Sequence, residues 1–139
     1  MDHTATTREM YDRLNAHDVD GFGDLLADDF VEHEVTPGLE PNKEGVKQFF
    51  RMYMAGFPDM RMEPEDLIVS GDKVVARVRG TGTHDGEFMG MPPTGKSVDL
   101  DLIDILRFED DGLCHEHWGV FDALKMMQQL GAIPEGPPA

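Results

Sequence analysis

Apolar residues recur at helical spacing through the first half of the chain. The pattern predicts a helix over residues 7–17, where Thr6 and Glu9 have the spacing of a capping box. A short second helix is expected to begin at Asp20, and a third, with a broad aromatic face, to begin at Asn42. The apolar positions behind these predictions are Met10, Tyr11 and Leu14, then Phe22, Leu25 and Leu26, then Val46, Phe49, Phe50, Tyr53 and Met54.

Elsewhere the hydrophobic pattern has a period of two, which is typical of strands. A short strand is expected over residues 30–35, and four more follow the third helix. Turn residues separate the four, so consecutive strands are expected to pair antiparallel. Asp122 is placed to cap a last helix that runs through Leu130. The four later strands are expected over residues 67–70, 74–83, 96–109 and 113–121.

Helices first and long strands afterwards predict an α+β fold, with the helices on one face of a curved antiparallel sheet. Such a sheet leaves a cavity between itself and the helices, so we expect a cone-shaped pocket there. The 139 residues fit a single domain over residues 1–139, with 134–139 as a frayed tail.

Composition narrows the classes of partner. Twenty-eight acidic against 12 basic residues give a formal charge of −16, which repels nucleic acid and anionic lipid. No apolar run approaches the roughly 18 residues of a membrane-spanning helix. The single Cys114 cannot form an internal disulfide, and the N-terminus lacks the pattern of a signal peptide. We therefore expect a cytoplasmic protein that binds neither nucleic acid nor membrane.

The most informative residues lie on the last two strands. Alternation places Asp104 on an otherwise apolar strand face, and His117 lies on the next strand. Depending on the turn, Asp104 lies opposite His117, or opposite Gly119 and diagonal to His117; both registers put the two side chains on the same side. A carboxylate beside an imidazole in a partly dry cavity can transfer protons near neutral pH. We interpret Asp104 and His117 as the candidate catalytic pair.

Other interpretations of these residues stay open. An Asp–His pair can be purely structural, since ion pairs inside a sheet also satisfy each other. His115 and His117 have the spacing of two metal ligands on one strand face, with Asp104 as a third, but no clear fourth ligand exists, and we expect no metal. Two further histidines are candidates for the pocket: His33, at the end of the short strand, and His84, at the start of a Gly- and Pro-rich loop over residues 84–96.

Three segments resemble a known family. The loop 84–96 reads H-x-G-E-x-x-G-x-P-P-T-G-K, residues 103–108 read I-D-I-L-R-F, and residues 128–131 read Q-Q-L-G. Together they resemble the SnoaL-like polyketide cyclases of the NTF2-like superfamily, and the resemblance covers nearly the whole chain. It implies a cone of curved sheet plus helices, an intramolecular aldol condensation without metal or cofactor, and a homodimer, with a tetramer as the alternative.

The resemblance also implies site residues. The family's principal acid falls at Gly119, two residues after His117, and its second catalytic position falls at Asp104. The principal acid is therefore missing, and we expect Asp104 to have taken over as the base. The residues expected to contact substrate are Leu14, His33, Phe49, Tyr53, His84, Leu102, Trp118 and Gly119, although alternation points Trp118 away from His117 unless the strand bulges.

Two functions from different classes follow. In the first, the protein is a cofactor-independent enzyme for a hydrophobic carbonyl compound, with Asp104 abstracting a proton and His117 orienting it or donating to the oxyanion. In the second, motivated by Gly119, it binds an apolar small molecule without catalysis. A structural dimer module without ligand is a third possibility. The limonene-epoxide hydrolases, which have a similar fold, rely on an Asp-Arg-Asp set in the pocket. This sequence offers Asp85 and Glu87 near the corresponding strand with no Arg between them, so that activity is disfavoured.

Overall fold

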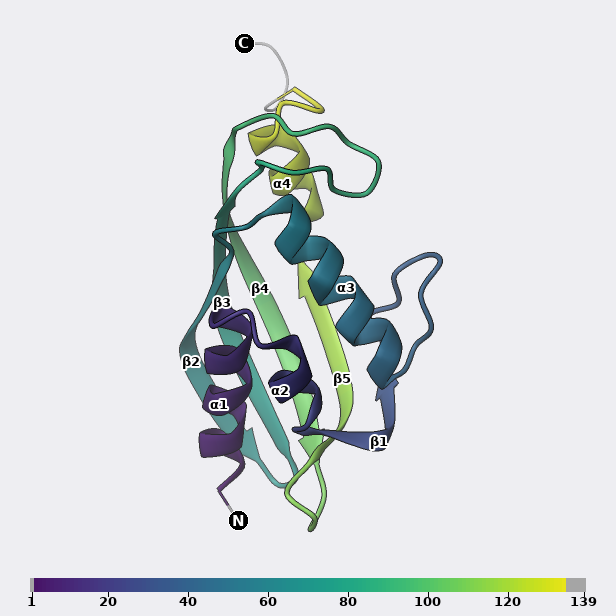
Figure 1. Ribbon diagram of the computed structural model, residues 1–139. Coiled ribbons are helices and arrows are strands. Elements are labelled where there is room, and N and C mark those ends of the chain that lie inside the picture. The colour runs from purple at the N-terminus through teal and green to yellow at the C-terminus, as the bar shows by residue number, and fades with distance from the viewer. Residues whose placement is uncertain (1, 135–139) are drawn as a thin grey trace.

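The computed structural model of the protein describes residues 2–134 and confirms the α+β class: three helices cover one face of a curved sheet (Figure 1). Met1 and residues 135–139 lie outside the described residues, so most of the expected C-terminal tail is not covered. The elements in chain order are α1 (His3–Asn15), α2 (Val19–Gly23), β1 (Leu26–Glu32), α3 (Lys43–Gly56), β2 (Arg61–Ser70), β3 (Lys73–Thr83), β4 (Ser97–Phe108), β5 (Cys114–Phe121) and α4 (Ala123–Gln129).

The sheet is five-stranded, in the order β1-β5-β4-β3-β2. Strands β2 to β5 pair antiparallel with their chain neighbours, as expected, whereas β1 pairs parallel with β5. The register places Asp104 opposite Gly119 and Leu106 opposite His117, which is the second of the two predicted registers. Glu32, at the end of β1, lies beside His117. The last residues of β1 and the middles of β4 and β5 are therefore neighbours.

Two predicted helix starts were wrong. Asp2 caps α1 by accepting hydrogen bonds from Thr4 N and Ala5 N, so the helix begins a turn earlier than Thr6 suggested. Asp18, not Asp20, caps α2, since Gly21 N donates to its Oδ1 at 2.9 Å. The predicted caps Asn42 and Asp122 are confirmed, at Gly45 N and Lys125 N respectively.

Two strands differ in extent from the prediction. Strand β1 begins at Leu26 and ends at Glu32, because Leu26 and Ala27 are buried beside β5 rather than helical. Strand β2 begins at Arg61, six residues before the expected start. Its first half is charged and contains Pro64 at a register shift, so it lacks clean alternation; an edge strand tolerates such a proline.

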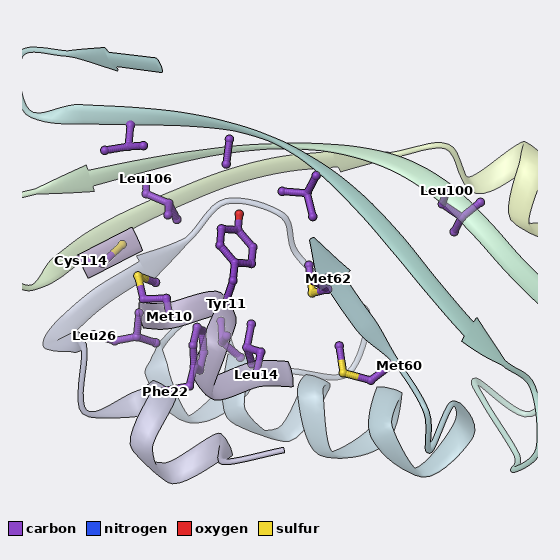
Figure 2. Packing of buried hydrophobic residues seen from close by; sticks show 14 of the residues in the cluster. Met10, Tyr11, Leu14, Phe22, Leu26, Met60, Met62, Leu100, Leu106 and Cys114 are labelled. Atoms are coloured by element: carbon purple, nitrogen blue, oxygen red, sulfur yellow. The ribbon is translucent and has the colours of Figure 1, made fainter. Parts of the chain in front are cut away.

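The core lies between the sheet and the helices. Tyr11 and Leu14 of α1 are 4% and 2% exposed, and they belong to one buried cluster with Leu106 of β4 (Figure 2). The helices thus bury the inner face of the sheet. No helix in the described part of the chain is long and apolar enough to cross a membrane.

Candidate active site

A cavity of about 470 Å³ lies between the helices and the inner face of the sheet. Most of its lining is apolar and comes from α1, α3, β4, α4 and the loop that follows β3. Four of the predicted contact residues line it: Leu14, Phe49, Tyr53 and Leu102. Burial raises the pKa of the Tyr53 hydroxyl to about 12, so Tyr53 stays neutral. The cavity therefore suits a largely hydrophobic molecule.

On the sheet side, charged side chains linked by hydrogen bonds interrupt this apolar lining. His117, on the strand between β1 and β4, bonds a carboxylate on each neighbour: Nδ1 lies 2.5 Å from Glu32 Oε2, and Nε2 lies 2.8 Å from Asp104 Oδ1. The strand register produces this arrangement, because it sets Glu32 beside His117 and Asp104 diagonal to it. The expected Asp104–His117 contact is present, and Glu32 is an addition that the sequence did not reveal.

Tyr11 extends the chain from the helix side. Its hydroxyl points from α1 toward the sheet (Figure 2) and donates to Asp104 Oδ2 at 2.6 Å. Burial, together with the charge of Asp104, holds the Tyr11 pKa well above its usual value. Asp104, 7% exposed, therefore accepts one short hydrogen bond on each oxygen. Two donors on separate elements fix the orientation of this carboxylate.

His117 carries a positive charge in this setting. Burial lowers its pKa, but the hydrogen bonds to Asp104 and Glu32 outweigh burial and raise the pKa to about 10. Both ring nitrogens then donate, one to each carboxylate. A doubly donating imidazolium has no lone pair with which to accept a proton. His117 is thus suited to hold Asp104 in place and to stabilise negative charge, not to act as a base.

Glu34 is a cavity-lining carboxyl that our sequence analysis missed. It lies just past the end of β1 and lines the cavity. A carboxylate oxygen of Glu34, a carboxylate oxygen of Asp104 and a ring nitrogen of His117 all lie within 4.8 Å of one another. Burial raises its pKa; the His117 charge opposes this, Asp104 and Glu32 reinforce it, and the result is about 7. The alternation of Glu32 and Glu34 along the predicted strand was a signal that could have found both.

Gly119 permits the close packing around these groups. A Cβ built at this position would lie 2.8 Å from both Asp104 Oδ1 and His117 Cε1, and it would also contact the carboxylate of Glu34. Those separations are shorter than real Cβ contacts allow. At the position where the resemblance places an acid, any side chain would therefore require these neighbours to shift.

Four predicted contact residues are not part of the cavity lining: Gly119, whose neighbours are described above, and His33, His84 and Trp118. Trp118 and His33 stack on each other with ring centroids 4.7 Å apart, and His33 Nε2 lies 2.7 Å from Glu116, on the outer face of the sheet. Strand alternation turns Trp118 away from His117, as expected without a bulge at that point. His84 is fully buried in its loop, where Nδ1 lies 3.0 Å from Thr94 Oγ1 and the ring stacks on Phe57.

The alternative of a metal between His115 and His117 does not fit the geometry. A register shift in β5 leaves His115 without a partner on β4, and its ring binds Asp111 at 2.8 Å, away from the partners of His117. Glu34, Asp104 and His117 are close enough for three ligands. However, a histidine binds a metal as the neutral ring, and here both nitrogens of His117 are engaged with carboxylates.

Comparisons with known proteins agree with this architecture. The family model of the SnoaL-like polyketide cyclases matches residues 5–130. AclR of Streptomyces galilaeus, whose suggested activity is hydroxylation, is 31% identical with a TM-score of 0.84, over 97% of this chain and 84% of AclR. IdmH of Streptomyces antibioticus, whose suggested activity is polyketide cyclisation, is 33% identical with a TM-score of 0.82, over 94% of this chain and 99% of IdmH.

A third similar structure is TsrD of Streptomyces laurentii, which is 30% identical with a TM-score of 0.82, over 93% of this chain and 97% of TsrD. The comparison with curated proteins finds no match. The NTF2-like fold expected from the sequence is confirmed. With a family model that covers almost all of the described residues, the chain belongs to the SnoaL-like polyketide cyclase family.

Proposed function

We propose that the protein catalyses proton transfer on a hydrophobic carbonyl compound without a cofactor, in the manner of an aldol-type ring closure. One observation carries this proposal: a chain of four hydrogen-bonded polar side chains, Tyr11, Asp104, His117 and Glu32, reaches a largely apolar cavity. Buried charge of this kind costs stability unless it is compensated, and it is typical of sites that hold or move protons.

In the proposed reaction Asp104 is the base. It takes a proton from the carbon next to a carbonyl group; the C–H bonding electrons become the enolate, and its negative charge resides on the carbonyl oxygen. The nucleophilic carbon then attacks a second carbonyl carbon of the same molecule, which forms the ring. His117 holds Asp104 and, as a cation, favours the negative charge that develops. The electron pair of the second C=O bond moves to its oxygen, and this alkoxide takes up the proton from Asp104, which restores the base. The product is an isomer of the substrate, so no oxidant or reductant is needed.

The comparisons support this class of substrate. The family's name and the suggested activity of IdmH both concern polyketides, which carry several carbonyl groups on an apolar chain. A homodimer and a cytoplasmic location are also part of the proposal. The exposed Ile103 and Val120, neighbours on the outer face of the sheet, support pairing of two copies. Light scattering that finds a monomer would contradict the dimer.

A simple model ketone, 1-tetralone, tests the proton transfer. We would follow exchange of the C2 protons of 1-tetralone for deuterium in D₂O by NMR, with and without the protein. We expect exchange well above the buffer rate, and a loss of about 100-fold or more in Asp104→Asn, in line with the usual contribution of a general base. Asp101→Asn is the matched control, because this exposed carboxylate lies on the same strand.

The alternative function is binding without catalysis, and Gly119 is the observation that favours it. In that case 1-tetralone or a larger aromatic ketone would shift the NMR signals of cavity residues such as Leu14 and Leu102. Exchange of the C2 protons would remain at the buffer rate. That combination of results would contradict the proposed enzyme and support a binding module.

A further inference from the structure

The space beside Gly119 is occupied by a carboxyl group from another part of the chain. Glu34 Oε2 lies where a side chain at position 119 would begin, and Asp104 Oδ1 and His117 Cε1 border the same point at 2.8 Å. Glu34 comes from the segment that connects β1 to α3, so it reaches this point from the opposite edge of β5 to Asp104. Residue 119 and Glu34 compete for one position at the cavity.

The Glu34 carboxyl has no hydrogen-bond donor among residues 2–134, in contrast to its neighbours. Glu32 is bonded by His117, and Asp104 by both His117 and Tyr11. Glu34 instead lines the cavity between apolar side chains, with two carboxylates and one imidazolium as its charged neighbours. A carboxyl group in such a place keeps its proton more readily than one that accepts hydrogen bonds from charged donors.

We propose that Glu34 is the general acid of the site and protonates the carbonyl oxygen while Asp104 removes the proton from carbon. This inference rests on the proposed function and adds a second catalytic residue to it. Two carboxyl groups with opposed environments mark an acid and a base: the fixed, hydrogen-bonded Asp104 is the base, and the unbonded, cavity-facing Glu34 is the acid. Its pKa of about 7 keeps a large share of Glu34 protonated at neutral pH.

The proton balance closes within the site. Asp104 gains the proton that leaves carbon, and Glu34 loses its proton to the oxygen that accepts the electron pair. A carboxylate oxygen of Asp104 and one of Glu34 lie within 4.8 Å of each other, a distance that one water molecule can bridge. When the enol carbon attacks the second carbonyl group, the first oxygen returns its proton to Glu34, and Asp104 gives its proton to the new alkoxide, which restores both groups. The ring closure is an isomerisation overall, so no further reactant is needed.

The pH dependence of deuterium exchange into 1-tetralone tests the role of Glu34. In the wild type we expect the exchange rate to fall as pH rises through about 7, because Glu34 loses the proton that it donates. The groups that face Glu34 and set this value are Glu32, Asp104 and His117. In Glu34→Gln we expect a rate about 100-fold lower at pH 6 and no fall near pH 7. Glu65→Gln, an exposed glutamate on β2, is the matched control and should behave as the wild type.

The outcomes separate the two proposals. A wild type that exchanges protons while Glu34→Gln keeps the same rate and the same pH profile would overturn the inference about Glu34 alone. A wild-type rate that rises through pH 7 would also overturn it, since Glu34 would then act as a base. A wild type without exchange would contradict the proposed function itself.

Moving the carboxyl group provides a second test. In a Glu34→Ala background, Gly119→Asp removes the shortest of the three contacts at position 119 and places a carboxyl group there, while the side chains of Asp104 and His117 must still shift. We expect it to recover at least tenfold of the lost exchange rate. Gly119→Asn in the same background has the same size without the acid, and it should recover nothing. Equal rates for the two double variants would contradict the claim that a carboxyl group at this point is what the reaction requires.

Discussion

Two histidines on β5, His115 and His117, have similar partners but different surroundings. Each ring nitrogen of both residues lies within about 3.2 Å of a carboxylate. The side chain of His115 is 9% exposed and that of His117 is 15% exposed, so the burial of the rings themselves does not distinguish them. Their carboxylate partners do.

The partners of His117 are buried, whereas those of His115 are open to solvent. The side chains of Glu32 and Asp104 are 13% and 10% exposed, but those of Asp29, Glu109 and Asp111 are 47–84% exposed. Water screens the charges of the second set, and ion pairs of that kind contribute little. The comparison teaches that the number of ion pairs around a histidine is a poor guide to their contribution. The burial of the partner carboxylates decides whether the cluster contributes to stability and chemistry.

Substitution of the two histidines gives the largest expected contrast. His117→Gln removes the cation from between two buried carboxylates, which should lower the free energy of unfolding by about 3–5 kcal/mol. His115→Gln loses only pairs with exposed partners, so we expect a loss of about 1 kcal/mol or less. Urea unfolding at pH 7 measures both. Equal losses would show that the two clusters do not differ as described.

A methyl group at position 119 tests the packing of the inner cluster, which consists of Tyr11, Glu32, Glu34, Asp104 and His117. Gly119→Ala places Cβ against Asp104, His117 and Glu34, and we expect it to lower the free energy of unfolding by about 1–3 kcal/mol. In a Glu34→Ala background the penalty should shrink, because one of the three contacts has gone. A penalty of the same size in both backgrounds, measured by urea unfolding, would mean that Glu34 does not occupy this space.

The pH dependence of stability gives the smallest effect. The pKa of Glu34 is raised in the folded protein, so folding takes up a proton between its ordinary value of 4.5 and about 7. The contribution of Glu34 to stability is therefore present below pH 4.5 and is lost as pH rises through 7. Allowing for partial exposure, we expect the wild type to lose roughly 1 kcal/mol more than Glu34→Gln over this interval. Thermal unfolding at several pH values measures this effect. A difference in the free energy of unfolding between the two proteins that stays constant with pH would contradict the account.

Local pattern was enough to predict much of the inner cluster. Regular alternation in β4 and β5 and the Gly112 turn limited Asp104 and His117 to one face in either register. The polar Asp104 in an apolar row was itself the signal of a site. The caps Asn42 and Asp122 followed in the same way from the residues around them.

The missed residues depend on contacts between distant parts of the chain. Glu32 and Glu34 reach the site because β1 pairs parallel with β5, a contact across 85 positions for Glu32 and His117. No pattern within either segment fixes that pairing. The register shift that isolates His115 depends on the β4–β5 pairing, so the spacing of two histidines misleadingly indicated a shared metal.

A direct measurement of the Glu34 titration tests the central claim that the inner cluster separates an acid from a base. We would label glutamate with ¹³C at the side-chain carboxyl, assign the Glu34 signal by its absence in Glu34→Gln, and follow it by NMR from pH 3 to pH 9. We expect Glu34 to titrate with a pKa of about 7, far above the ordinary glutamate value of 4.5. A Glu34 signal that titrates at the ordinary value would contradict the account.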